Sequence, residues 1–192
     1  TQKHAKLGAL TVPAAVCEGG VLALTAPTIT NNKGAEVTNP KWFLDGNEFD
    51  PATSVTHDEH NDKPLYYQIT SSCNGKERDI TTTPAVNVTV HALPTAAFDA
   101  ASSTICIDEQ DEELTNIKVN FTGAAPFELT YQDEAGSTYV ENNLTASAVL
   151  LNQALDGDEL YTLKSVTDAN GCTSSVTGQT HQVNTKKHAS LD

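Results

Sequence analysis

The chain contains short stretches in which apolar and polar residues alternate with a period of two. Such alternation places the apolar side chains on one face of an extended strand and the polar side chains on the other. It predicts half-buried β-strands, and no window carries a helical stripe longer than about two turns. The clearest stretches are 86–91, 117–122 and 127–132, with the apolar residues Val86, Val88, Val90, Ile117, Val119, Phe121, Phe127, Leu129 and Tyr131.

Residues that favour turns separate these stretches. Asn74-Gly75 and Asn170-Gly171 suit two-residue hairpins, because both positions of such a turn take positive φ. Further turns are marked by Asp45-Gly46-Asn47, by residues 123–126 and by Asp156-Gly157-Asp158. About seven short strands in each ~95 residues, joined at hairpin spacing, are typical of an immunoglobulin-like β-sandwich. The sequence therefore predicts an all-β protein.

A repeat in the cysteine positions divides the chain into two halves. Cys17 and Cys106 are 106 − 17 = 89 residues apart, and each precedes an alternating strand. Cys73 and Cys172 are 172 − 73 = 99 residues apart, and each follows a strand that carries tyrosine. An internal repeat of this kind indicates two copies of one structural unit. We predict two tandem immunoglobulin-like β-sandwich domains, residues 1–92 and residues 93–192.

The four cysteines allow three disulfide pairings. The repeat favours one bridge in each domain, Cys17–Cys73 and Cys106–Cys172. Zinc is the alternative, but the sequence has no C-x-x-C and no clustering of Cys with His. Paired cysteines imply an oxidising compartment, which makes the protein extracellular, cell-surface or periplasmic.

The net charge excludes two classes of partner. The chain has 11 Lys plus Arg and 25 Asp plus Glu, a formal net charge of −14. Proteins that bind nucleic acid or anionic membrane surfaces depend on clustered cationic residues, so neither partner is expected. The longest uninterrupted apolar runs have four residues, as at Ala148 to Leu151, far too short to span a bilayer.

Several stretches carry a family resemblance. The second half resembles the immunoglobulin-like (PKD-like) repeats of large exported surface proteins of Bacteroidetes, and the first half resembles their more divergent members. The resemblance implies exported, non-catalytic modules that space or present other domains, or that adhere. The stretches are Ile105-Cys106, VNFTG (119–123), PFELTY (126–131) and LYTLKSVTDANGC (160–172) in the second half, and VCEGGVLALTAP (16–27) and WFLDG (42–46) in the first.

The negative charge is concentrated in the second half. Residues 1–92 have 7 − 10 = −3 and residues 93–192 have 4 − 15 = −11. Two acidic loops would lie at one pole of an immunoglobulin topology, and converging carboxylates are the ligands that calcium prefers. Plain solvated loops are the favoured interpretation, and a cationic partner is a third. The candidate calcium ligands are Asp108, Glu109, Asp111, Glu112, Asp156 and Asp158.

Two further features of the first half suggest binding. The segment HDEHND (57–62) has side chains that bind transition metals, although an exposed loop is the favoured interpretation. Trp42 and the adjacent Tyr66 and Tyr67 suggest carbohydrate binding, because sugar rings stack on exposed aromatic side chains. Adjacent tyrosines on a strand point to opposite faces, and Trp42 shares its face with Leu44, so we expect Trp42 and one tyrosine in the core.

Nothing in the sequence indicates catalysis. The chain has no G-x-S-x-G, no phosphate-binding glycine loop and no H-E-x-x-H. No signal peptide or lipidation motif is visible and the chain begins at Thr1, so we expect a trimmed fragment of a larger exported protein. We predict a non-catalytic, monomeric spacer, presentation or adhesion module without cofactor, whose partners are other domains of the same polypeptide or surface proteins. The alternatives are a carbohydrate-binding module and a calcium-rigidified adhesin segment.

Overall fold

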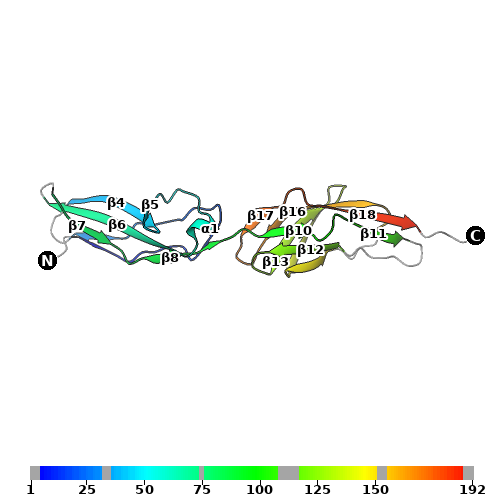
Figure 1. The fold of residues 1–192 in the computed structure, drawn as a ribbon, viewed down its shortest axis with the longest axis horizontal. Coiled ribbons are helices and arrows are strands. Elements are labelled where there is room, and N and C mark those ends of the chain that lie inside the picture. Colours follow the sequence, from blue (N-terminus) through cyan, green and yellow to red (C-terminus); the bar gives the residue numbers. More distant parts are fainter. Residues whose placement is uncertain (1–4, 32–35, 74–75, 108–116, 151–154, 188–192) are drawn as a thin grey trace, which may run out of the picture. The chain divides into compact units, whose positions relative to one another are not determined.

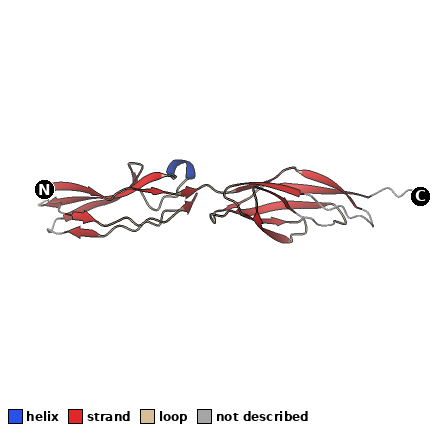
Figure 2. Ribbon diagram, turned by 90° about the horizontal axis from the view of Figure 1, so that it is seen from below, coloured by secondary structure: helices blue, strands red, loops and turns tan. Residues whose placement is uncertain are grey.

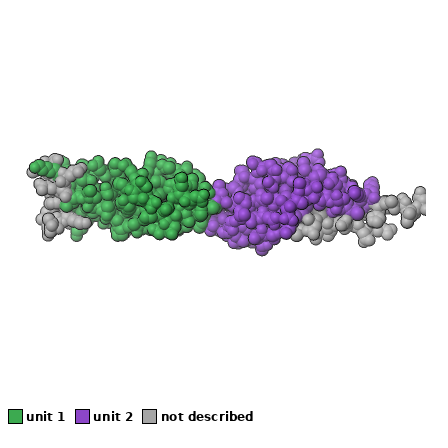
Figure 3. Space-filling model, in the orientation of Figure 1, with its two compact units in different colours: residues 1–92 green, residues 93–192 purple. Residues whose placement is uncertain are grey.

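The structure is a computed structural model that describes residues 5–31, 36–73, 76–107, 117–150 and 155–187. The chain forms two compact units, unit 1 (Thr1–Ala92) and unit 2 (Leu93–Asp192), which Figure 3 shows in green and purple. Each unit has its own buried hydrophobic cluster. Strands dominate both units, and the helix α1 in unit 1 has a single turn (Figure 2).

Unit 1 is built on a sheet in which the strands follow the order β5-β4-β6-β7, with β8 also paired to β6. β1 pairs with β3, and β2 pairs in parallel with β9. The β4–β5 hairpin turns at Asp45-Gly46, within the predicted turn 45–47. The two residues take φ values of 49° and 81°, as a two-residue hairpin turn requires. The elements of unit 1 are β1 (Ala5–Leu7), β2 (Val16–Cys17), β3 (Ile29–Asn31), β4 (Glu36–Leu44), β5 (Asn47–Phe49), α1 (His57–His60), β6 (Lys63–Cys73), β7 (Lys76–Thr82), β8 (Val86–Val88) and β9 (Val90–His91).

The core of unit 1 forms from the inward faces of β4 and β6. Trp42 is 9% exposed, and its ring meets the Tyr67 ring edge-on at 4.8 Å. Leu65 and Ile69, on the same face of β6 as Tyr67, are fully buried. The prediction for the strand over 86–91 is only partly correct: Val88 and Val90 are buried, whereas Val86 is 36% exposed.

Unit 2 consists of two sheets that face each other (Figure 1). One sheet has the order β10-β12-β15 and the other has the order β11-β18-β16-β13-β14, with β17 also paired to β16. The strands of unit 2 are β10 (Thr95–Phe98), β11 (Ser102–Ile107), β12 (Ile117–Thr122), β13 (Phe127–Gln132), β14 (Thr138–Leu144), β15 (Ser147–Leu150), β16 (Glu159–Thr167), β17 (Thr173–Ser175) and β18 (Thr180–Lys187).

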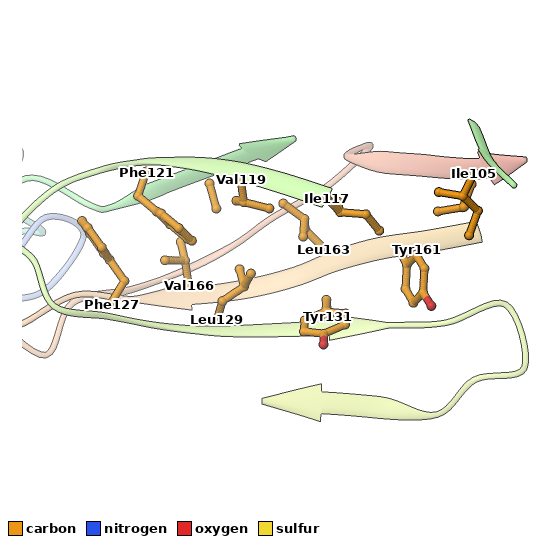
Figure 4. Packing of buried hydrophobic residues seen from close by; sticks show 12 residues of the cluster. Ile105, Ile117, Val119, Phe121, Phe127, Leu129, Tyr131, Tyr161, Leu163 and Val166 are labelled. Carbon is orange, nitrogen blue, oxygen red and sulfur yellow. The ribbon is translucent and has the colours of Figure 1, made fainter. Parts of the chain in front are cut away.

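The core of unit 2 follows the alternation of the sequence. Along β12 and β13 every second residue is buried, and the residues between are exposed or half-buried. Their apolar side chains meet those of β16 between the sheets (Figure 4). Burying one such large apolar side chain stabilises the fold by about 1.5–3 kcal/mol. The labelled core residues are Ile105, Ile117, Val119, Phe121, Phe127, Leu129, Tyr131, Tyr161, Leu163 and Val166.

The two units share several strand pairings. In each, an early strand pairs in parallel with the last strand: β2 with β9 in unit 1 and β11 with β18 in unit 2. In each, a central antiparallel pair follows, β4 with β6 and β13 with β16. The central strand also pairs with the hairpin strand after it, β7 or β17. The predicted fold class is confirmed: the chain is all-β and consists of tandem immunoglobulin-like β-sandwiches.

Candidate functional site

Cys17 and Cys172 are both disulfide-bonded. Cys17 ends β2 and lies opposite His91 in β9. Cys172 lies in the hairpin between β16 and β17. The position of each cysteine within its own unit decides which partners it can reach.

The predicted Cys17–Cys73 pairing is wrong, because the two residues lie at opposite ends of unit 1. Cys73 is the last residue of β6, and Lys63, the first, pairs with Val88. The ten steps from Lys63 to Cys73 span about 33 Å. His91, opposite Cys17, lies beyond the Lys63 end of β6. A disulfide needs Cα atoms less than about 7 Å apart.

The predicted Cys106–Cys172 pairing is wrong for the same reason. Cys106 pairs with Lys186 in β18, three residues beyond Val183, which pairs with Glu159 at the start of β16. Cys172 lies past the other end of β16. The eight steps of β16 and the three of β18 together span about 35 Å.

The candidate calcium site is described only in part. Asp108, Glu109, Asp111 and Glu112 lie outside the described residues. Asp156 lies in the loop before β16. Among the residues that the structure describes, no three His, Cys, Asp or Glu side chains gather as a metal site would require. Calcium binding stays a prediction, and a calorimetric titration of the chain that gives no heat at millimolar calcium would contradict it.

Asp158 has a structural role. Its Oδ1 accepts hydrogen bonds from the backbone N–H of Thr185 at 2.6 Å and from the Thr185 hydroxyl at 2.9 Å. These bonds lower the pKa of Asp158, because they favour the charged carboxylate. They hold the start of β16 against β18.

The HDEHND segment forms the helix α1 and the residues after it, rather than the predicted loop. His60 Nδ1 accepts a hydrogen bond of 3.0 Å from the backbone N–H of Thr56. Asn61 Oδ1 accepts from the backbone N–H of Val90 at 3.0 Å, and Asp62 Oδ1 accepts from the Asn87 amide at 2.8 Å. The polar groups of Asn61 and Asp62 therefore join this segment to the last strands of unit 1.

Asp168 organises the β16–β17 hairpin. Its Oδ1 accepts from the backbone N–H groups of Asn170 at 2.9 Å and of Cys172 at 3.1 Å. Its Oδ2 accepts from the backbone N–H of Ala124 at 3.3 Å. The last bond, to a loop 44 residues earlier, has no signal in the sequence. Asp168 is 6% exposed, so it is an internal acceptor and not a surface ligand.

His181 is a buried polar residue that sequence reasoning missed. Its Nδ1 lies 2.7 Å from the Ala100 carbonyl oxygen, and its Nε2 lies 2.9 Å from Ser103 Oγ. A carbonyl oxygen can only accept, so Nδ1 carries a proton in this bond. His181 is 3% exposed and connects β18 to β11, through Ser103, and to the segment between β10 and β11, through Ala100.

The aromatic residues of unit 1 divide between the core and the surface, as predicted. Trp42 and Tyr67 are buried, and Tyr66 is half-buried on the opposite face of β6. The sequence reasoning missed the neighbour of Tyr66. Phe43 of β4 is paired with Tyr66, and the two rings stack at 5.2 Å with only 4° between their planes. Lys41, two residues before Phe43 in β4, forms a salt bridge with Glu48, which pairs with Phe43 from β5.

Three tyrosines of unit 2 gather around acidic side chains. Tyr131 stacks on Tyr139 at 5.2 Å and meets Tyr161 edge-on at 6.2 Å. Burial, together with the charge of Glu141, raises the pKa of Tyr131 far above its ordinary value. Burial, with the charge of Glu159, raises the pKa of Tyr161 to about 12. A hydrogen bond from Tyr139 to Asp133, 2.8 Å long, raises the pKa of Tyr139.

The raised tyrosine pKa values predict that alkali destabilises unit 2. Above about pH 10, the ordinary tyrosine pKa, the unfolded chain loses phenol protons that the folded unit retains. The stabilisation is therefore complete below about pH 10 and is lost as pH rises through the folded pKa of Tyr161, about 12. Urea unfolding followed at a series of pH values should show this fall. Tyr161→Phe should flatten it, and an unchanged pH dependence in that variant would contradict the assignment.

No helix among the described residues is long and apolar enough to cross a membrane. No protein-family model matches the chain. No curated protein sequence matches it significantly.

Several solved structures resemble the chain. The crystal structure of Rst D1-D2 is 11% identical, with a TM-score of 0.45, and the match covers 97% of this chain and all of that one (100%). The crystal structure of DIP-gamma IG1+IG2 is 14% identical, with a TM-score of 0.39 and coverage of 98% and 99%. A Ca2+-stabilized adhesin that helps an Antarctic bacterium reach out and bind ice is 18% identical, with a TM-score of 0.43; the match covers 96% of this chain and 50% of that one.

Proposed function

We propose that the chain is a non-catalytic tandem module of a larger bacterial surface or secreted protein, where it spaces and presents neighbouring domains. The observation that carries the proposal is the repetition of one complete sandwich. Each unit has its own buried core, and the division between the units falls between Ala92 and Leu93 without a separate linker domain. A series of independently folded units can separate the domains that precede and follow it, and this is what a spacer requires.

The polar groups of the units support this role. Asp158, Asp168 and His181 bond to backbone or side-chain groups of unit 2 itself. They therefore stabilise the fold of unit 2. The disulfide-bonded cysteines fit an extracellular, cell-surface or periplasmic location. The resemblance of residues 105–172 to the immunoglobulin-like repeats of Bacteroidetes surface proteins points to the same setting.

Stretching the chain by its ends tests the spacer role. A spacer has to remain folded under load, so the reduced chain should give one cooperative unfolding event for each unit. Each event should lengthen the chain by roughly 3.3–3.6 Å per residue released, less the folded span. Gradual extension without cooperative events would contradict the proposal. A variant with a truncated core residue in one unit, Leu65→Ala, should weaken one event and leave the other unchanged.

The second candidate function is adhesion to a carbohydrate through the outer face of the β4–β6 pair. The stacked rings of Phe43 and Tyr66 support it, because two aligned aromatic side chains offer an apolar surface to a sugar ring. The burial of Trp42 counts against it, since that ring cannot take part. A glycan array should detect binding that Phe43→Ala and Tyr66→Ala remove. Val140→Ala, at an exposed residue of β14, is the matched control, and an array without hits would exclude this function.

A further inference from the structure

β14 forms an open edge of the larger sheet of unit 2. It pairs with β13 and, among the described residues, with no other strand. The backbone N–H of Asp133 donates to the Ser137 carbonyl, which shows which pairs of this ladder are hydrogen-bonded, because bonded and non-bonded pairs alternate in an antiparallel ladder. The backbone N–H and C=O groups of Thr138, Val140 and Asn142 therefore point away from β13 and toward the open edge.

The sequence of β14 leaves this edge accessible. Proteins usually protect an edge strand by keeping it short or by placing Lys or Pro in it. β14 has seven residues with neither Lys nor Pro, and Val140 is 52% exposed. The edge strand β7 of unit 1 has the same length but begins with four charged residues, Lys76 to Asp79. β14 can therefore accept an extended segment as a further strand.

A bulge near the end of β14 adjoins a polar pocket. The register shifts there, so that Asn142 and Asn143 of β14 together oppose Glu128 of β13, and such bulges re-aim side chains. The pocket has a volume of about 460 Å³, within the range of small ligand sites. It is lined by residues 126–128, 142, 143 and 167–169. Among the described residues, the side chains of Glu128, Asn142 and Asn143 make no hydrogen bond, so their polar groups are available to a ligand.

The charge of this hairpin determines which segment fits it. Residues 127–144 contain four acidic residues and no Lys or Arg, a formal charge of 0 − 4 = −4. An occupant with Lys or Arg complements this surface. A second copy of β14 would bring the same carboxylates together, and like charges on facing strands are destabilising. The acidic residues are Glu128, Asp133, Glu134 and Glu141.

We propose that the open edge of β14 and the pocket beside it bind an extended segment of a partner protein that carries Lys or Arg. The main chain of the segment pairs with Thr138, Val140 and Asn142, and one cationic side chain enters the pocket and pairs with Glu128. In this mode of recognition the main-chain hydrogen bonds supply affinity and the side-chain pocket supplies specificity. The inference lies within unit 2 and does not depend on the spacer role.

Selection from a peptide library tests the occupant. Phage that display random peptides are selected on the immobilised whole chain, and the most enriched peptide is synthesised as the probe. We expect extended peptides rich in β-branched residues with at least one Lys or Arg, and an affinity that falls as the salt concentration rises. The probe should also slow hydrogen exchange of the Val140 amide. Enrichment of acidic or uncharged peptides, or no enrichment, would overturn the proposal.

Substitutions locate the binding surface. Val140→Pro removes an N–H that points to the open edge and leaves the bonds to β13 in place, so it should weaken binding of the probe by about tenfold. Thr104→Pro is the matched control. Thr104 lies in β11, the opposite edge of the same sheet, and the alternation along its ladder turns its N–H outward as well, but binding should be unchanged.

A third variant tests the pocket without touching the backbone. Glu128 is exposed, so Glu128→Gln should keep the urea unfolding of unit 2 unchanged while it weakens binding severalfold and reduces its dependence on salt. Full binding by folded Val140→Pro, or by Glu128→Gln, would contradict the proposed site. Sedimentation of the chain alone distinguishes the remaining occupant: a dimer that Val140→Pro dissociates would assign the edge to a second copy and overturn the proposal.

Discussion

Leu129→Ala should destabilise unit 2 by about 2–5 kcal/mol and leave unit 1 folded. Leu129 lies in the middle of β13, is fully buried, and packs between the two sheets of unit 2 (Figure 4). Truncation removes apolar contacts and leaves a cavity that the surrounding strands fill only in part. The clusters of the two units share no residue, so the loss should be confined to unit 2.

The aromatic residues make this prediction measurable. The chain has a single tryptophan, Trp42, which is packed in the core of unit 1. Its fluorescence reports the unfolding of unit 1 in urea. Near-ultraviolet circular dichroism of the tyrosines reports both units, since Tyr66 and Tyr67 lie in unit 1, and follows unit 2 once the unit 1 transition measured by fluorescence is subtracted. Leu129→Ala should shift only the second transition. Leu65→Ala, at a fully buried residue of unit 1, is the matched control and should shift the fluorescence transition. Equal shifts of both transitions in either variant would contradict independent cores.

The strands could be predicted because one face of each strand is buried. Ile117, Val119 and Phe121 are buried as the alternation requires, and so are Phe127, Leu129 and Tyr131. At the edge of a sheet, the alternation of apolar and polar residues predicts burial less well. Val86 pairs with Leu65 near the end of β6 but remains 36% exposed, because an edge residue can keep the strand pattern without a layer to cover it.

The cysteine partners could not be predicted from the repeat. The similar neighbours of Cys17 and Cys106, and of Cys73 and Cys172, indicate equivalent positions, but they do not show at which end of a sandwich each cysteine lies. That depends on strand direction. β2 and β11 pair in parallel with the last strands, which places the early cysteine of each unit at the end opposite the late one. The bonds of Asp168 and His181 to distant loops were missed for a related reason, since they join segments whose proximity comes only from the folded sheets.

Asp168→Ala should destabilise unit 2 by about 3 kcal/mol, an unusually large effect for a turn residue. The substitution removes the acceptor of three backbone N–H groups, those of Ala124, Asn170 and Cys172. Asp168 is 6% exposed, so water cannot easily replace the carboxylate. The Cys172 donor is buried, and a buried donor left without a partner costs about 1–3 kcal/mol before the structure relaxes. The Ala124 and Asn170 donors are part-buried and add less. Urea unfolding of unit 2, followed by tyrosine circular dichroism, measures the loss.

Two variants separate the hydrogen bonds of Asp168 from a general effect of turn residues. Asp168→Asn keeps one oxygen acceptor but turns an NH2 group toward donors. It should therefore lower the free energy of unfolding of unit 2, but by less than Asp168→Ala does. Asp133 also holds a turn, through a 2.7 Å bond from the Ser137 N–H to its Oδ1, but in a more exposed loop. Asp133→Ala should therefore have a clearly smaller effect, because water can reach the donors that it exposes. Equal losses for Asp133→Ala and Asp168→Ala would show that the bridge from the hairpin to Ala124 adds nothing, and that turn geometry alone accounts for Asp168.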